Sequence, residues 1–226
     1  DWRGLFCLLA ALVACTGLLI ALLYPKSDGP AANRGPLLPA LREVWRAPAF
    51  RSVASLVLIP HAVFFGIQGL WIGRWLLDVA HYPEESVAFM LYLGMAAVVF
   101  GAIAVGMITE WAGRRGMAPL DVAAAGITFF VLVQAAFVVG YRPSFQVLSV
   151  LFTLVGTITG IEYAIVAQAM PRELTGRAAT FLNLLIFIGA FLVQAGFETL
   201  VELWPSDLLG HAPSQAYRAG FALLVL

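Results

Sequence analysis

Long apolar stretches separated by short polar segments run along the whole chain. A helix needs roughly 20 apolar residues to cross a bilayer core about 30 Å thick. Six stretches reach or approach that length, and they cover residues 5–23, 53–77, 86–108, 118–140, 144–168 and 179–201. The pattern predicts an all-α polytopic membrane protein with six full transmembrane helices.

A seventh apolar stretch begins near Tyr217 and reaches Leu226 after ten residues. At about 1.5 Å per residue, a helix of this length makes roughly half a crossing. An apolar helix that stops in mid-bilayer is an unusual terminus, and the sequence opens with Asp1 instead of an initiator Met. We therefore expect a fragment, cut at both ends, whose seventh helix is truncated.

The composition agrees with a bilayer environment. Of 226 residues, 62% are hydrophobic and 12% are charged, whereas a soluble domain is nearer half apolar and a quarter charged. The 13 basic and 13 acidic side chains cancel, so the chain has no overall positive field to attract nucleic acid. These values exclude a water-soluble globule, a disordered segment and a nucleic-acid-binding protein.

The basic residues predict an orientation. Alternate connectors place nine of them on one side of the membrane, namely Lys26, Arg34, Arg42, Arg46, Arg51, Arg114, Arg115, Arg172 and Arg177. The other side has four, Arg3, Arg74, Arg142 and Arg218. The positive-inside rule makes the first side cytoplasmic. The strong bias to arginine over lysine, with abundant alanine, is typical of a GC-rich bacterial genome, so we expect a bacterial inner-membrane protein.

Residues 24–49 form the longest polar segment, which Pro and Gly residues punctuate. Inside it, five residues have the spacing of one apolar helix face: Leu37, Leu38, Leu41, Val44 and Trp45. Arg42, Glu43 and Arg46 take the other face. The pattern predicts a short amphipathic helix on the cytoplasmic membrane surface. Since the sequence leaves no room for a soluble domain, function must reside among the helices.

The spacings typical of enzyme and metal sites do not occur in the sequence. His61 has no histidine four residues later, and His81 and His211 fall in the predicted outer connectors. The sequence contains no phosphate-binding loop or nucleophile elbow, and no Asp lies deep in a predicted span. We therefore expect no enzyme, no metal and no cofactor, and the default becomes a carrier or channel.

The clearest local motif lies in the third connector, which reads GMITEWAGRR over residues 106–115. Glu110 precedes Arg114 by four residues, the favourable order for a helical ion pair, and Gly113 is expected to allow the tight reversal. The fifth connector repeats the Glu-x-x-Gly-Arg spacing with Glu173, Gly176 and Arg177. Two readings stay open: the clusters pair to latch this face shut in one conformation, or they are positive-inside anchors.

Gly-x-x-x-(Asp/Glu)-x-x-Gly-Arg-(Arg/Lys) between two spans resembles the cytoplasmic loop motif of the major facilitator superfamily. The matching positions are Gly106, Glu110, Gly113, Arg114 and Arg115. The resemblance implies helices 6–12 of a twelve-helix fold. Residues 1–23 would be the last helix of the N-terminal half, residues 24–49 the connector between halves, and residues 50–226 the C-terminal six-helix bundle. The missing N-terminal half of the same chain would be its partner.

Two departures from the family pattern narrow the resemblance. The sugar porters of this family carry Glu-x6-Arg in the connector that corresponds to residues 170–178, whereas Glu173 and Arg177 are only four residues apart. This spacing argues against that branch. Glu110 also replaces the commoner Asp.

The resemblance further implies that helices seven, eight, ten and eleven face a central cavity. Polar groups inside these spans are then candidates for substrate or coupling contact. Glu162 ranks first because it is the only carboxylate well inside a span, where burial favours its neutral form. The alternative is a gate partner for Arg172 or Arg177. The other candidates are Tyr163, His61, Gln68, Trp71, Asn183 and Gln194, and for them structural hydrogen bonds between helices remain an equal alternative.

Four further expectations concern residues in or near the spans. Pro60 removes a helical hydrogen bond and favours a kink beside His61. Arg74 and Asp78 form a surface ion pair of small energy, Glu198 could belong to an external gate, and Gln134 is structural.

Together these features predict a secondary active transporter that moves a small solute by alternating access between two pseudo-symmetric halves, coupled to H+. Its partners would be the lipid bilayer, a small-molecule substrate and the proton. A different class stays open, a transport-inactive transporter-like protein that serves as a sensor or membrane partner. A passive channel is a third possibility.

Overall fold

The computed structural model describes residues 2–23, 36–140 and 144–225, in two compact units, Asp1–Gly35 and Pro36–Leu226. Lys26, Arg34 and Arg142 of the predicted charge pattern, and the first part of the predicted connector, lie outside the described residues. In the first unit, α1 (Trp2–Leu23) is a continuous apolar helix, and none of its residues is buried. The second unit contains all the candidate site residues.

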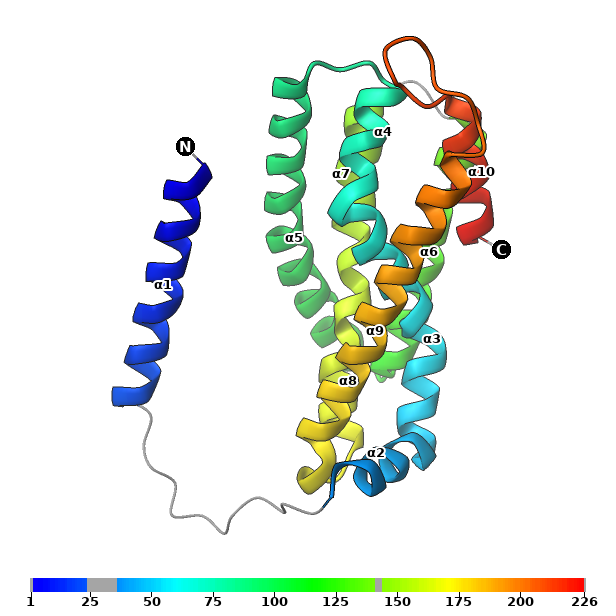
Figure 1. The fold of residues 1–226 in the computed structure, drawn as a ribbon. Coiled ribbons are helices and arrows are strands. Elements are labelled where there is room, and N and C mark those ends of the chain that lie inside the picture. Colours follow the sequence, from blue (N-terminus) through cyan, green and yellow to red (C-terminus); the bar gives the residue numbers. More distant parts are fainter. Residues whose placement is uncertain (1, 24–35, 141–143, 226) are drawn as a thin grey trace. The chain divides into compact units, whose positions relative to one another are not determined.

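The second unit is an all-α bundle (Figure 1). Its helices are α2 (Leu37–Arg46), α3 (Pro48–Gly66), α4 (Ile72–Asp78), α5 (Glu84–Gly113), α6 (Pro119–Val139), α7 (Phe145–Gly156), α8 (Glu162–Ala169), α9 (Arg172–Val201) and α10 (Ser214–Val225). A π turn, η1 (Ile67–Trp71), joins α3 to α4, and a 3₁₀ turn, η2 (Thr157–Ile161), joins α7 to α8. These turns make two long spans from four helices.

Six helical segments are long and apolar enough to cross a membrane: Trp2–Leu23, Pro48–Asp78, Glu84–Gly113, Pro119–Val139, Phe145–Ala169 and Arg172–Val201. They coincide with the six predicted stretches, so the predicted all-α polytopic membrane fold is confirmed. The described part of the seventh helix, α10, begins at Ser214, three residues before the apolar stretch. The polar Ser214, Gln215 and Arg218 make its first turns too hydrophilic for a hydropathy pattern to include.

The bundle interior is apolar and rich in aromatic rings. One buried cluster joins α4, α6, α7, α9 and α10 and includes Trp75, Phe137, Phe152, Phe197 and Phe221. A second lies toward the α2 end and joins α3, α6, α8 and α9. Because α3 packs along α9 over much of its length, a polar side chain on its inner face, such as His61, lies deep in the bundle.

Gly156 shows how closely these helices approach. A Cβ at this position would overlap the ring of Phe64, which is itself buried. Phe64 packs against Phe130 and Phe152, with ring centroids 6.2 Å away in both cases. The missing side chain thus lets α3 and α7 meet at an aromatic contact, as small residues do in membrane helix packing.

Two local expectations are modified by the structure. Helix α3 runs through Pro60, and α geometry is interrupted further along, at η1. The predicted amphipathic helix exists as α2, but its buried residues are Ala40 and Val44. The larger apolar residues of the predicted face, Leu37, Leu38 and Trp45, remain exposed.

Candidate functional site: polar groups in the bundle

A hydrogen bond between His61 and Glu162 lies in the interior of the bundle. Nδ1 of His61 on α3 is 2.5 Å from Oε1 of Glu162, the first residue of α8. The two residues are 4% and 0% exposed. One proton satisfies the contact, held either by the imidazole or by the carboxyl group. Arg172 and Arg177 were the alternative partners expected for Glu162 from the sequence, but the observed partner is His61.

The second oxygen of Glu162, Oε2, is buried and has no hydrogen-bond partner among the described residues. An unsatisfied buried oxygen costs free energy, and in native structures such groups mark strain or function. Glu162 is therefore held at one oxygen only. The other is available for a proton or for a ligand.

Aromatic side chains surround the His61 end of this pair. The ring of Phe65 is 4.4 Å from the imidazole centroid, and the ring of Tyr163 is 6.2 Å away. The hydroxyl of Tyr163 donates to Oδ1 of Asn183 over 2.7 Å, which connects α8 to α9. Four of the predicted candidates, His61, Glu162, Tyr163 and Asn183, thus form one connected group, which we call the inner cluster.

A second polar contact joins the same two spans. The hydroxyl of Thr153 on α7 donates to Oε1 of Gln68 in η1 over 2.5 Å, and both residues are buried. His61 and Gln68 are seven residues apart, and both bond the span that contains α7 and α8. The structure therefore confirms the expectation that they share one face. Thr153 itself was missed because threonine is common in apolar spans and gives no sequence signal.

Trp71 and Gln194 lie apart from the inner cluster. The indole of Trp71 packs 4.9 Å from the ring of Phe197, and its Nε1 has no partner within the described part of the chain. Gln194 on α9 lies against Gly69 in η1, where its Nε2 is 3.4 Å from the place a Cβ would take. Gln134 is buried, and its Nε2 bonds the carbonyl of Phe130 in its own helix at 3.5 Å.

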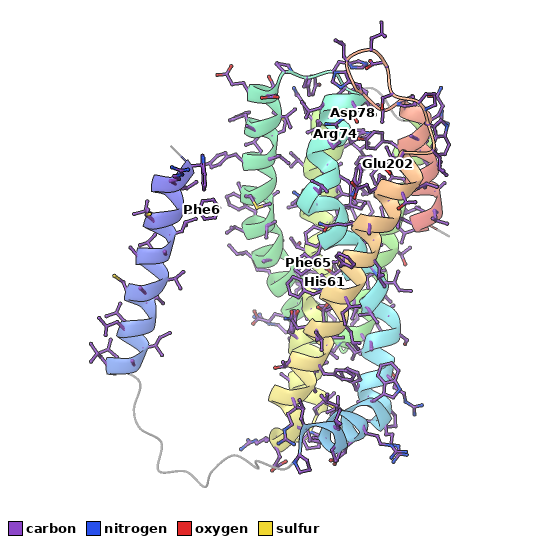
Figure 2. All side chains as sticks on the ribbon, viewed as in Figure 1. Phe6, His61, Phe65, Arg74, Asp78 and Glu202 are labelled. Atoms are coloured by element: carbon purple, nitrogen blue, oxygen red, sulfur yellow. The ribbon has the colours of Figure 1, made fainter. Side chains whose placement is uncertain are left out.

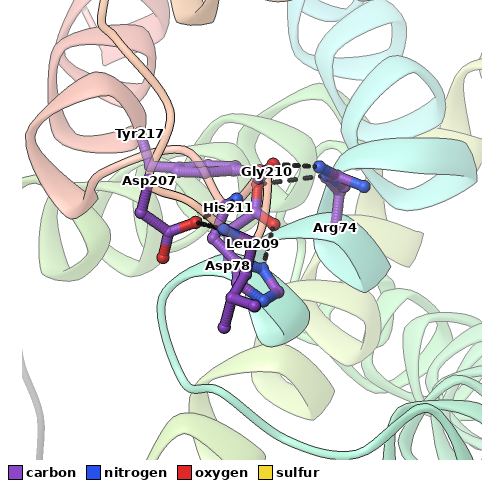
Figure 3. Close-up of polar contacts among 7 residues, drawn as sticks. All are labelled: Arg74, Asp78, Asp207, Leu209, Gly210, His211 and Tyr217. Atoms are coloured by element: carbon purple, nitrogen blue, oxygen red, sulfur yellow. Dashed lines mark hydrogen bonds and ion pairs between the residues drawn. The ribbon is translucent and has the colours of Figure 1, made fainter.

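Asp78 lies at the opposite end of the α3–α4 span from α2, and Figure 2 shows it with Arg74, away from His61 and Phe65 in the middle of the bundle. Asp78 is 3% exposed. It accepts hydrogen bonds from Arg74 Nε at 3.1 Å and Tyr217 Oη at 2.7 Å, and its other oxygen is 3.1 Å from His211 Nδ1. We call these four residues the Asp78 cluster (Figure 3). The predicted ion pair of Arg74 and Asp78 is therefore present, but its placement on the surface is wrong for Asp78, because α10 and the preceding loop cover the carboxylate.

The loop that carries His211 is itself tied down. Arg74 Nη2 donates to the carbonyl of Gly210 over 3.0 Å. Oδ1 of Asp207 accepts the backbone N–H groups of Leu209 and His211 at 2.9 and 2.8 Å (Figure 3). These bonds, that of His211 first, hold the pKa of the Asp207 carboxyl below its usual range. The segment 207–211 is therefore an ordered turn, which we call the strap.

The motif of residues 106–115 lies at the end of α5, on an exposed surface. Glu110 pairs with Arg114 at 2.5 Å, with 67% and 75% of the two side chains exposed, and Arg115 stacks 3.6 Å over the ring of Trp111. Gly106 and Gly113 are exposed as well. The reversal was expected at Gly113, but this residue ends the helix and Gly116 has the left-handed backbone, with φ of 81°. The chain therefore reverses just after Gly113, and the left-handed residue of the reversal is Gly116 and not Gly113.

The second Glu/Arg cluster is part of a helix. Glu173, Gly176 and Arg177 lie in the first turns of α9, which begins at Arg172, and not in a connector. Glu173 and Gly176 are exposed, and Arg177 is half-buried. In the first cluster, the partner of Glu110 is Arg114, four residues along the chain. An exposed ion pair of this kind contributes little stability.

A family model described as Major Facilitator Superfamily matches residues 1–194. The chain belongs to the major facilitator superfamily. No curated protein and no solved structure matches it. The superfamily consists of membrane transporters and not enzymes, so this major facilitator chain is a multi-pass membrane protein of a transporter family that moves small solutes.

Within residues 2–23, 36–140 and 144–225, no group of three or more His, Cys, Asp or Glu side chains is placed to hold a metal ion. The inner cluster has two titratable groups in contact, His61 and Glu162. The Asp78 cluster has a buried carboxylate shared by Arg74 of α4, His211 of the strap and Tyr217 of α10.

Sequence reasoning found Arg74 as a partner of Asp78 but missed the other two. His211 and Tyr217 are more than 130 residues further along the chain, and no local spacing connects them to it. The available signal was the position of Asp78 itself, a carboxylate at the very end of an apolar span. A residue at such a boundary can turn inward as easily as outward.

Proposed function

We propose that this chain acts in a secondary active transporter that moves a small solute by alternating access and couples that movement to protons. The observation that carries the proposal is the buried hydrogen bond between His61 and Glu162. The two groups belong to different spans, so a change in protonation at this contact acts directly on how the spans hold together.

The geometry supports a coupling role for Glu162. Its Oε1 bonds His61, while Oε2 has no hydrogen-bond partner in the described part of the chain, and the residue is surrounded by apolar and aromatic groups. An unpaired carboxylate is costly in such surroundings. When His61 is displaced, Glu162 must either take up a proton or find a new partner, and a bound solute can supply one. Tyr163 and Asn183, half-buried beside the pair, are the proposed contacts for that solute.

Membership of the family supports the remaining parts of the proposal. Residues 50–226 would form one six-helix half and move against a second half, with α1 belonging to the latter and residues 24–49 connecting the two. The α2 end would face the cytoplasm, because Arg42, Arg46, Arg51, Arg114 and Arg115 all lie near the ends of spans on that side. The expected location is a bacterial inner membrane.

The decisive experiment is Glu162→Gln in the full-length protein reconstituted into liposomes. Uptake of a panel of solutes driven by a pH gradient should be lost, while exchange of the same solute across the membrane should persist. Glu85→Gln makes the same chemical change at an exposed site on α5 and should retain both. Gradient-driven uptake that survives Glu162→Gln would reject the coupling role. A wild-type protein that moves no solute of the panel would favour a sensor.

A further inference from the structure

Helix α2 has one side docked on the bundle and one side that no described residue of this unit covers. Ala40 and Val44 are buried against α3 and α9. On the neighbouring edge, Leu37, Leu38 and Trp45 are 62%, 78% and 49% exposed. Exposed large apolar residues in such a group mark a contact surface. We call these three residues the free edge of α2.

The contacts of Trp45 show where α2 lies along the bundle. Its ring packs 6.2 Å from the rings of both Phe50 on α3 and Phe181 on α9. Phe50 is followed by Arg51, after which no charged residue occurs until Arg74. In α9, no charged residue occurs between Arg177 and Glu198. Trp45 therefore lies where the uncharged stretch of both spans begins, which is the usual depth of interfacial tryptophan.

Positive charge borders the free edge. Arg42 and Arg46 follow Leu38 by four and eight residues, so they lie on the adjoining strip of the helix. Both are exposed, as is Arg51. Glu43 is five residues from Leu38 and points well away from the free edge. A surface groove of about 480 Å³ runs between Leu38, Pro39, Arg42, Glu43 and Arg46. At this depth, the apolar side chains can contact lipid acyl chains while the neighbouring arginines reach lipid phosphate groups.

We propose that α2 binds the anionic phospholipid surface of the leaflet at its end of the bundle. Leu37, Leu38 and Trp45 enter the boundary between headgroups and acyl chains. Arg42 and Arg46 pair with lipid phosphates, and each basic residue near an anionic surface adds attraction. The one-residue linker Ala47 joins α2 to α3, so this edge lies next to the start of a helix long and apolar enough to cross a membrane. The proposal does not depend on transport or on coupling.

The experiment places an NBD fluorophore on α2 of the full-length protein, in a background of Cys7→Ser and Cys15→Ser. One variant carries the label at Leu38→Cys and its matched control at Glu43→Cys, since both positions are exposed on the same helix. The protein is placed in nanodiscs of equal parts phosphatidylcholine and phosphatidylglycerol. Either lipid is brominated on its acyl chains as a quencher, and iodide serves as the quencher in water.

Brominated lipid should quench the label at Leu38→Cys more than the label at Glu43→Cys, and brominated phosphatidylglycerol more than brominated phosphatidylcholine. Replacing Arg42 or Arg46 by Gln should lower the preference for phosphatidylglycerol about fivefold per arginine, from ~1 kcal/mol per basic residue. Arg172→Gln, an exposed arginine on α9, should leave the preference unchanged.

Three results would overturn the proposal. Equal iodide quenching at both positions would mean that the free edge faces water. Protection from both iodide and lipid would mean that protein covers it. Equal quenching by the two brominated lipids, unchanged by Arg42→Gln and Arg46→Gln, would mean that α2 touches the bilayer without selecting anionic lipid.

Discussion

Nδ1 of His61 and Oε1 of Glu162 lie 2.5 Å apart across the contact between α3 and α8, and neither side chain reaches the surface. Each residue is the hydrogen-bond partner of the other. Removing either one leaves the other as a buried polar group, so the pair should behave as a unit in stability measurements.

His61→Ala should lower the free energy of unfolding by about 1–3 kcal/mol, because Glu162 is then buried with neither oxygen bonded. Adding Glu162→Leu should recover part of this loss, since both polar partners are then gone. Unfolding in detergent, followed by circular dichroism, gives the loss of stability for His61→Ala, for Glu162→Leu and for the double variant. A double variant whose loss equals the sum of the single losses would show that the two side chains do not interact.

Asp78→Ala should loosen the strap. The substitution removes the acceptor for Arg74, His211 and Tyr217, and it leaves the buried Tyr217 hydroxyl unpaired, which costs about 1–3 kcal/mol. Hydrogen exchange of the backbone N–H groups of Leu209 and His211 should become faster, as should exchange at the start of α10. Glu85→Gln is the control and should change neither. Unchanged exchange in Asp78→Ala would show that the strap holds without this carboxylate.

Acid should weaken the strap through Asp207. The pKa of this carboxyl is lowered in the folded turn, so its stabilising effect is complete above the unfolded value of about 3.9 and is lost as pH falls through the folded value. Protection factors at Leu209 and His211 should therefore decrease below about pH 4. In Asp207→Asn they should be lower and should not change over this range. Equal pH profiles in the two proteins would contradict the assignment.

Gly156→Ala should be destabilising, whereas Gly160→Ala should not. A Cβ at Gly156 would overlap the ring of Phe64, while nothing lies within 4 Å of a Cβ at Gly160. Overpacking of a tight core costs about 1–3 kcal/mol. Thermal unfolding of the two variants side by side tests the difference, because both make the same chemical change within one turn of the same span. Equal losses would mean that α3 and α7 can separate without cost.

The spans could be predicted because hydropathy is a property of consecutive residues, and all six appear in the structure. Sequence reasoning also selected His61, Glu162, Tyr163 and Asn183 one by one, because polar groups inside apolar spans are costly and usually line a cavity or pair with one another. It could not connect them, since hydrogen bonds such as His61 to Glu162 join positions 101 residues apart. These contacts depend on how the spans pack against one another, which local patterns in a single sequence do not show.

The errors have a common physical origin. Asp78 was placed on the surface because the neighbouring Arg74 offered a local partner, whereas α10 and the strap supply the burial. Gly113 was expected to turn the chain because it is a glycine near the end of a motif, but it is still the last residue of α5, and Gly116 takes the left-handed conformation. In both cases the residue type was read correctly, and the longer-range structure determined where it acts.

The bonds from His61 to Glu162 and from Gln68 to Thr153 both link the span of α3 and α4 to the span of α7 and α8, at two separate heights. Sliding one span along the other by one helical turn, about 5.4 Å, would break both bonds at once. Any movement that keeps both bonds must move the two spans together as one rigid body. Shear between them then requires both bonds to open, and protonation is a chemical means of opening the first.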